Sequence, residues 1–197
     1  MPGRFQFLTS ATRLEQCPAD MRPEVAVLGR SNSGKSTLIN AWAQSQIAKT
    51  SSTPGKTRLI NFFDGPHYRL VDFPGYGFAK RSGDEQASWG GMIETFLSTR
   101  GSLKGALLLM DCRREWTSEE AMLLQFLNRR GSPMAVVLTK SDKLNRSEET
   151  KMRAKFKTLP GVSAIFFVSS TKKTGIDELE EYVYRNWVLE EPATENA

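Results

Sequence analysis

An eight-residue stretch with fixed glycine and lysine positions constrains the fold of this chain more than any other feature. Residues 29–36 read Gly-Arg-Ser-Asn-Ser-Gly-Lys-Ser, which fills every fixed place of the pattern G-x-x-x-x-G-K-[ST]. The apolar run Glu24–Leu28 precedes this stretch, and Ser36–Gln44 has the pattern of a helix. A strand, a glycine turn and a helix in this order predict a loop that binds the phosphates of a nucleoside triphosphate.

The residue types in this loop have physical roles. Glycines at positions 29 and 34 let the backbone curl, so that successive N–H groups face the phosphate oxygens. We expect Lys35 to reach the β- and γ-phosphates and the Ser36 hydroxyl to bind Mg²⁺. The residues expected to contact the nucleotide here are Gly29, Arg30, Ser31, Asn32, Ser33, Gly34, Lys35, Ser36 and Thr37.

Length and composition favour one globular domain. Of the 197 residues, 39% are hydrophobic and 25% are charged, which is enough to bury an ordinary core. Cys17 and Cys112 lack metal-binding or redox spacing, and we find neither a secretory signal nor an apolar run of about 18 residues. We therefore expect a cytoplasmic protein with reduced thiols and no membrane association.

The chain is more basic than its formal net charge of +5 indicates, because Glu190, Glu191 and Glu195 are the only charges in its last ten residues. Without these three residues the net charge is +8. Such a surplus suits a nucleic-acid partner, although a basic surface that only aids solubility has the same composition.

Six apolar runs with strand propensity recur along the chain. They are Val25–Leu28, Leu59–Phe63, Tyr68–Phe73, Gly105–Met110, Met134–Leu138 and Ala164–Val168. The turn residues Asp64-Gly65-Pro66 separate the second run from the third and predict a hairpin, so this pair is expected to be antiparallel in an otherwise parallel sheet.

Helical patterns alternate with these runs. They lie at Ser36–Gln44, about 86–99, Ser118–Arg129, Ser147–Lys157 and Ile176–Trp187. Thr117 and Glu120 form a capping box before the third helix, and Ser147-Glu148-Glu149 is expected to start the fourth. The alternation predicts an α/β fold with a doubly wound, six-stranded, mostly parallel sheet, one antiparallel strand, and helices on both faces.

The chain is expected to divide into three parts. Residues 1–23 form an N-terminal extension that packs on or near the core, and residues 24–189 form a single nucleotide-binding domain. Residues 190–197 are expected to be a disordered acidic tail.

The tetrapeptide Thr139-Lys140-Ser141-Asp142 predicts which base is bound, since the phosphate loop alone fits ATPases, small-molecule kinases and GTPases. It follows a strand and is similar to the guanine-specificity motif N-K-x-D. The Asp142 carboxylate can accept hydrogen bonds from the ring N–H and the exocyclic amine of guanine, and adenine would leave this acid unpaired. Lys140 is expected to lie over the base. Thr139 departs from the usual Asn, so the contacts of that Asn are expected to be weakened or rearranged.

Two further segments predict contacts to Mg²⁺ and the γ-phosphate. Asp72-Phe73-Pro74-Gly75 matches D-x-x-G, in which Asp72 would hold Mg²⁺ through a water and the Gly75 N–H would sense the γ-phosphate. The hydroxyl-rich stretch 50–58 has the character of a first switch, with Thr57 as the expected Mg²⁺ ligand and Thr53 as its rival. Other residues expected at the nucleotide are Gly55, Lys56, Thr57, Arg58, Leu59, Val168, Ser169 and Ser170.

The order and spacing of these five elements resemble the Ras-like translation-factor class of GTPases over roughly residues 24–187. The finer pattern resembles the EngB (YihA/YsxC) family of bacterial ribosome-assembly GTPases, within the TrmE-Era-EngA-EngB superfamily. It rests on G-R-S-N-S-G-K-S, S-S-T-P-G-K-T-R, D-F-P-G-Y-G-F-A, T-K-S-D and F-F-V-S-S. The resemblance implies a monomeric protein with a Ras-like G domain that binds GTP, GDP and Mg²⁺. It also implies a role with large-subunit precursors and ribosomal RNA, and a link to cell division and septation.

Two residues bear on the rate at which GTP would become GDP and phosphate. Tyr76 occupies the place where Ras-type enzymes have the Gln that orients the attacking water, which predicts slow intrinsic hydrolysis. Asn32 matches the position that coordinates K⁺ in related potassium-activated GTPases, and a cation there would act as an arginine finger does. A simple turn residue is the other interpretation of Asn32.

Basic pairs near loop regions suggest a partner surface, although such pairs are more often solvated. They are Lys80-Arg81, Arg113-Arg114, Arg129-Arg130 and Lys172-Lys173. In the GTP state they and the aromatic side chains of the second switch would meet ribosomal RNA. The alternative function is a guanine-nucleotide-dependent protein-binding module in cell division, with hydrolysis incidental to its role.

Overall fold

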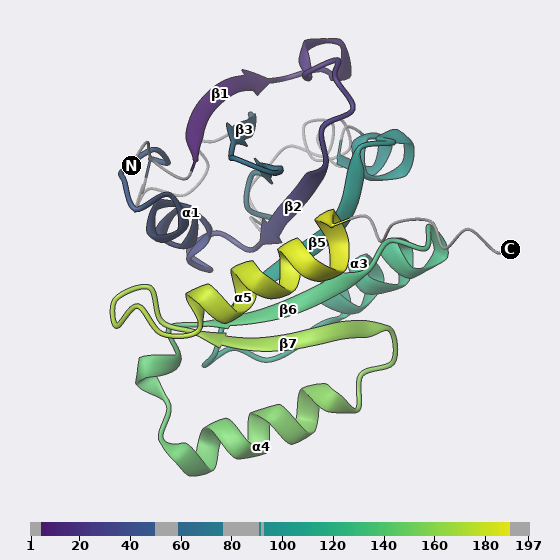
Figure 1. The fold of residues 1–197 in the computed structure, drawn as a ribbon. Coiled ribbons are helices and arrows are strands. Elements are labelled where there is room, and N and C mark those ends of the chain that lie inside the picture. The colour runs from purple at the N-terminus through teal and green to yellow at the C-terminus, as the bar shows by residue number, and fades with distance from the viewer. Residues whose placement is uncertain (1–4, 50–58, 77–90, 92, 190–197) are drawn as a thin grey trace, which may run out of the picture.

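The protein is an α/β sandwich, seen here in a computed structural model that describes residues 5–49, 59–76, 91 and 93–189. Within these residues, seven strands form one sheet in the order β1-β3-β4-β2-β5-β6-β7 (Figure 1). Their bounds are β1 Gln6–Ala11, β2 Glu24–Gly29, β3 Ile60–Asp64, β4 Arg69–Asp72, β5 Leu103–Asp111, β6 Met134–Thr139 and β7 Val162–Val168. The α/β class and the mostly parallel sheet are confirmed.

The antiparallel strand is the predicted one. β3 pairs antiparallel with both β1 and β4, whereas the pairs β2–β4, β2–β5, β5–β6 and β6–β7 are parallel. The hairpin between β3 and β4 turns over a hydrogen bond of 3.1 Å from the Gly65 N–H to the Tyr68 carbonyl. The turn residues at 64–66 therefore act as expected.

The predicted number of six strands is wrong, because the N-terminal segment supplies an edge strand. β1 pairs with β3 along its whole length: Gln6 lies opposite Asp64 at one end, and Ala11 lies opposite Ile60 at the other. The register shifts between Phe7 and Thr9. Most of its side chains are exposed or half-buried, so it lacks the apolar run of a strand that is covered on both faces.

The helices fall close to their predicted positions. They are α1 Lys35–Ala43, α3 Ser118–Arg129, α4 Arg146–Lys157 and α5 Ile176–Val183, and residues 93–99 are also helical. α5 continues as a π-helical segment, Tyr184–Val188. The Thr117–Glu120 capping box is present, with 2.9 Å between the Thr117 N–H nitrogen and a Glu120 oxygen. α4 starts earlier than predicted, because Asn145 caps it and bonds the Glu148 N–H.

Two apolar layers enclose the sheet. Alternate residues of β2 face opposite sides, so that Val25 and Val27 join one core while Ala26 and Leu28 join the other. α1 and α5 cover the first face, where Trp42 and Leu179 are fully buried. The second face is covered by the helix at 93–99, α3 and α4. Both faces of the sheet are thus covered, and the loops that follow the strands extend from its carboxyl edge.

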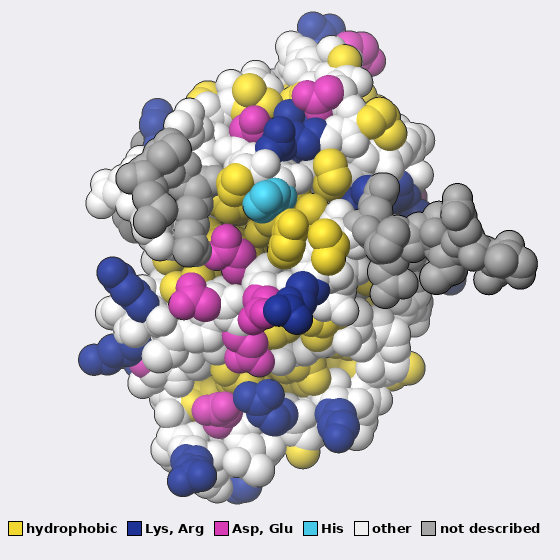
Figure 2. All heavy atoms as spheres, viewed as in Figure 1, with side chains coloured by type: hydrophobic (Ala, Val, Ile, Leu, Met, Phe, Trp, Pro, Cys, Tyr) yellow, Lys and Arg dark blue, Asp and Glu magenta, His cyan; other side chains and the backbone are white. Residues whose placement is uncertain are grey.

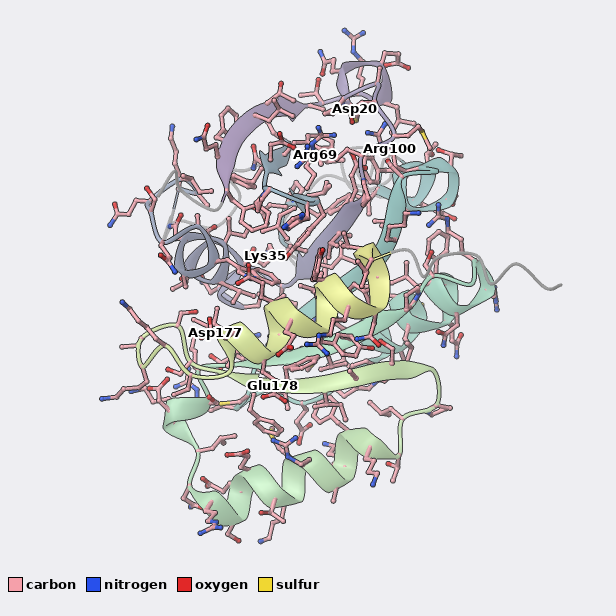
Figure 3. All side chains as sticks on the ribbon, in the orientation of Figure 1. Asp20, Lys35, Arg69, Arg100, Asp177 and Glu178 are labelled. Carbon is pink, nitrogen blue, oxygen red and sulfur yellow. The ribbon has the colours of Figure 1, made fainter. Side chains whose placement is uncertain are left out.

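Charged residues are buried at the opposite, amino ends of the strands. Glu24 is completely buried and accepts hydrogen bonds from Arg100 at 2.6 and 2.7 Å and from Ser102 at 2.9 Å. Arg69 lies 3.4 Å from Glu24 and binds Asp20 at 2.8 and 3.0 Å. In Figure 3, Asp20, Arg69 and Arg100 of this cluster lie in the upper part of the view, and Lys35 lies below them.

None of the helices in the described part of the chain is both long and apolar enough to cross a membrane.

Candidate nucleotide-binding site

The loop between β2 and α1 has the left-handed backbone that its sequence predicts. Gly29, Asn32 and Gly34 have φ angles of +149°, +65° and +94°. At Gly29 an added Cβ would lie 2.4 Å from the Leu109 carbonyl oxygen, so a larger residue does not fit beside β5. Gly34 caps α1 and accepts a hydrogen bond from the Leu38 N–H. The loop therefore passes directly into a helix N-terminus, where anions are stabilised.

Lys35 lies under this loop at the start of α1 (Figure 3). Its ammonium donates to the carbonyl of Gly29 at 2.9 Å and to that of Arg30 at 3.3 Å. Burial lowers the pKa of Lys35, and the nearby Asp72 charge opposes this effect. The two carbonyls hold the ammonium inside the loop, from which it can reach a phosphate.

Asp72 ends β4 beside Lys35 and is buried. Burial raises its pKa to about 6, although the Lys35 charge and a hydrogen bond from Asn61 act in the opposite direction. Within the described residues its Oδ1 atom is buried without a hydrogen-bond partner. A carboxylate oxygen left free in this way fits a hydrated Mg²⁺, which prefers oxygen ligands and keeps several of its waters.

Asn61 has an orienting partner that sequence patterns did not indicate. The Ser10 hydroxyl of β1 donates to Asn61 Oδ1 at 2.7 Å. This bond fixes the Asn61 amide so that its nitrogen faces Asp72. The N-terminal strand therefore supports the predicted metal-binding acid from a distance of 62 positions along the chain.

Thr139 contacts the phosphate loop directly, although it departs from the usual Asn. Its hydroxyl donates to the Ser33 carbonyl at 2.7 Å, with the Met110 carbonyl at 3.0 Å as the alternative acceptor. It also lies against Gly34, where an added Cβ would come 3.4 Å from the hydroxyl oxygen. A contact between this motif and the loop is thus retained through a shorter side chain.

Lys140 joins the same two parts of the site. Its backbone is left-handed, with φ +58°, and its ammonium lies 3.1 Å from the Asn32 carbonyl and 2.9 Å from Asp111 Oδ2. Arg113 also binds Asp111, and its hydrogen bonds, followed by those of Lys140, hold the pKa of that carboxyl well below its usual range. The methylene stem of Lys140 therefore spans the edge of the site, with its ammonium held by these two partners.

The Asp142 carboxylate is held by residues from two elements. Ser169, just after β7, donates to Asp142 Oδ1 at 2.6 Å, and Lys143 lies 3.3 Å from Oδ2. The Ser169 hydrogen bond, and then Lys143, lower the pKa of Asp142. Asp142 is consequently an anion at neutral pH, as an acceptor for two base N–H groups must be.

The Asp72–Gly75 segment packs closely on the phosphate loop. An added Cβ on Gly75 would lie 2.6 Å from the Ser31 nitrogen, and Tyr76 forms a parallel β-bridge with Arg30. Phe73 and Pro74 are buried behind this contact. The backbone of the predicted second switch thus begins against the loop that would hold the γ-phosphate.

The described predicted residues gather at the carboxyl edge of the sheet. Thr37 and Ser170, from opposite sides of the site, line one cavity of about 600 Å³. Ser36 is partly exposed in the first turn of α1. Ser141 begins the short 3-10 helix Ser141–Lys143 that carries Asp142, and Val168 ends β7 just before Ser169. Leu59 is half-buried just before β3.

Several predictions fall outside the described residues. The first switch is among them, so Thr57 as the Mg²⁺ ligand and Thr53 as its rival stay predictions. The others are Gly55, Lys56, Arg58, the pair Lys80-Arg81, the acidic tail at 190–197, and Phe78, one of the aromatic residues of the second switch.

Sequence comparison connects the chain with known GTP-binding proteins. Residues 24–140 match the family described as 50S ribosome-binding GTPases. The probable GTP-binding protein EngB of Bdellovibrio bacteriovorus is 53% identical over 191 residues, which cover 96% of this chain and 96% of that protein. Its namesake from Clostridium perfringens strain 13 is 44% identical over 190 residues, covering 94% of this chain and 96% of that protein.

Solved structures share the fold. A probable GTP-binding protein engB aligns with a TM-score of 0.65 and 24% identity, covering 82% of this chain and 96% of that one. Era in complex with MgGDPNP and a segment of 16S ribosomal RNA aligns with a TM-score of 0.68 and 24% identity, covering 86% of this chain and 58% of that one. These two likenesses concern the arrangement of the backbone alone.

Proposed function

This chain belongs to the EngB family of GTP-binding proteins, which are P-loop GTPases, and from this premise we propose that it is a GTP-hydrolysing switch in assembly of the large ribosomal subunit. The observation that carries the proposal is the match of residues 24–140 to 50S ribosome-binding GTPases. We further propose that it acts as a monomer in the cytoplasm and that it is linked to normal cell division and septation.

The site residues have complementary roles in this proposal. Asp142 selects guanine, while Lys35 and the N–H groups of the phosphate loop bind the phosphates. Ser36, Thr57 and, through a water, Asp72 would hold Mg²⁺. The bound ion neutralises charge on the β- and γ-phosphates. The Gly75 N–H binds the γ-phosphate. When hydrolysis removes this phosphate, the segment that follows Gly75 is released.

Hydrolysis is expected to be slow because of how Tyr76 is held. Its hydroxyl donates to Glu120 at 3.1 Å, so this proton is not available for orienting a water. Burial, followed by the Glu120 charge, raises the pKa of Tyr76 far above its usual range, so the phenol does not serve as a base either. Because Tyr76 assists in neither way, we expect another group to stabilise the negative charge that develops in the transition state of GTP hydrolysis.

We propose K⁺ at Asn32 as that group. Asn32 is exposed in a left-handed turn, and its carbonyl is engaged by Lys140, which leaves the side-chain oxygen for a cation. GTP hydrolysis is expected to be about tenfold faster in K⁺ than in Na⁺ at equal ionic strength, since one added positive charge acts directly on the transition state. Steady-state phosphate release measures this ratio.

Asn32→Gly is a matched variant for this test, because glycine accepts the positive φ and removes the side-chain oxygen together with the rest of the amide group. The variant is expected to lose the difference between the two salts while it retains GDP affinity. Equal rates of the parent protein in K⁺ and Na⁺ would show that Asn32 is a turn residue only.

Ribosomal RNA is a fitting partner for the basic surface. α4 alone carries Arg146, Lys151, Arg153, Lys155 and Lys157, against Glu148 and Glu149. Figure 2 shows Lys and Arg side chains over α4, in the lower part of that view. Glu148 accepts a hydrogen bond in the cap and Glu149 pairs with Arg153, and the five basic residues of the helix still outnumber these two acidic ones.

Co-sedimentation with large-subunit precursors tests the switch. Binding is expected to be at least about fivefold tighter with a non-hydrolysable GTP analogue than with GDP, the low end of typical coupling between two sites. Free small subunits serve as the control particle. Equal binding with either nucleotide contradicts the switch, and nucleotide-dependent binding to a division protein but not to the precursors favours the alternative module.

A further inference from the structure

The first turn of α3 touches both loops that flank the γ-phosphate position. Glu120 is 2% exposed at its side chain, and its Oε1 accepts from the Tyr76 hydroxyl at 3.1 Å and lies 3.4 Å from Arg30 Nε. Its Oε2 accepts from the Thr117 N–H at 2.9 Å and from the Thr117 hydroxyl. One buried carboxylate thus joins the phosphate loop, the segment after Asp72, and the start of a helix.

The backbones of the two loops are already adjacent where Glu120 joins them. Arg30 and Tyr76 form a parallel β-bridge, and Gly75 lies against Ser31 with no room for a side chain. The bridge and this close contact therefore hold the Gly75 backbone against the phosphate loop. Movement of Tyr76 would carry Gly75 away from Ser31.

The hydrogen bonds and charges around Glu120 stabilise its ionised carboxylate and hold it in place. Burial alone would raise its pKa, but hydrogen bonds from Thr117 and Tyr76 and the charge of Arg30 lower it instead. The group is an anion with every partner a donor, and hydrogen bonds to a charged group are stronger than neutral ones. Glu119 differs, because its exposed carboxylate contacts Arg30 alone among these residues, at 3.2 Å.

We propose that Glu120 is a positioning residue for GTP recognition and hydrolysis, which fixes Tyr76 and Arg30 so that Gly75 and Asp72 are held at the γ-phosphate. The proposal rests on the GTPase function proposed above. In place of the water-orienting Gln, the chain has a tyrosine that acts through α3. The start of α3 thereby becomes part of the machinery that distinguishes GTP from GDP.

The test compares Glu120→Gln, Tyr76→Phe and the double variant with the parent protein. The main readout is the affinity for a non-hydrolysable GTP analogue divided by the affinity for GDP, each from fluorescence titration. Each single variant is expected to lower this ratio about fivefold, the lower range of coupling between sites. The double variant is expected to equal the larger single effect, because both changes break the same contact.

Hydrolysis gives a second readout. With GTP saturating, kcat is expected to fall about tenfold in both single variants, since small displacements of a positioned group are costly in rate. GDP affinity is expected to change less than about threefold, because GDP lacks the phosphate that Gly75 senses.

Two matched variants separate positioning from helix capping. Glu148→Gln removes the equivalent carboxylate from the capping box of α4, which contacts neither Arg30 nor Tyr76, and Glu119→Gln removes only a partner of Arg30. Both are expected to leave the affinity ratio within about twofold of the parent, while Glu148→Gln lowers the melting temperature as Glu120→Gln does.

Additive effects in the double variant, or an unchanged affinity ratio in Tyr76→Phe, would overturn the proposal. If Glu120→Gln does not fold, the affinity ratio of Tyr76→Phe alone tests the proposal. Absence of hydrolysis by the parent protein would instead contradict the proposed GTPase function, and the affinity ratio would still decide the role of Glu120.

Discussion

Replacing Asp142 by alanine is expected to weaken GTP binding about a hundredfold or more, because two hydrogen bonds to a charged acceptor contribute about 1.5–3 kcal/mol each. The affinity for ATP is expected to change little, so that selectivity for guanine collapses. Competition titrations with GTP, ATP and inosine triphosphate measure both effects. Inosine triphosphate lacks the exocyclic amine, and only the parent protein is expected to distinguish it from GTP.

A charge control accompanies this variant. Glu178→Ala removes an exposed carboxylate from the first turn of α5 (Figure 3) and is expected to leave GTP affinity within about twofold, since exposed charges are screened. If Asp142→Ala retains a strong preference for GTP over ATP, the base is recognised by other residues.

Replacing Glu24 by glutamine is expected to lower the free energy of unfolding by about 3 kcal/mol, the lower end for breaking a buried ion pair. The change keeps the shape of the side chain but leaves Arg69 and Arg100 without their shared buried anion. Arg69 keeps Asp20 and Asp64, which limits the loss. Urea unfolding followed by fluorescence measures the change.

The control for this experiment is an exposed ion pair. Glu181 and Arg185 lie one turn apart with 2.7 Å between their charged atoms and with most of both side chains in solvent. Glu181→Gln is expected to cost less than about 0.5 kcal/mol. Similar losses in the two variants would mean that the cluster at the amino ends of the strands adds no stability of its own.

Strands covered on both faces were predictable, whereas the edge strand was not. β2, β5 and β6 read as continuous apolar runs because helices cover both sides of the sheet. β1 is half-exposed, and its partner β3 begins about 50 positions later, a pairing that no local pattern announces. The start of α4 was misplaced because Asn145 and Ser147 are both good capping residues, although only Asn145 has Glu148 at the third position.

The candidate site was predictable where chemistry demands one residue type at a fixed spacing. The glycines of the phosphate loop, Lys35 and Asp142 are of this kind. Ser10, Asn61, Asp111 and Glu120 are common residue types whose importance comes from neighbours brought together by the sheet. A motif search passes over them, because the bonds Ser10–Asn61, Tyr76–Glu120 and Lys140–Asp111 join residues that lie from 29 to 51 positions apart.

The order of strands in the sheet bears on how the protein folds as it leaves the ribosome that makes it. β1, β3, β4 and β2 are neighbours in space and all lie within residues 6–72, so they can assemble while the rest of the chain is still being synthesised. β5, β6 and β7 then join the growing edge at β2 one after another, in the order of translation. Among the strands that the structure describes, none that is made later has to insert between two that are already paired, so the nascent chain can build the sheet without rearranging it.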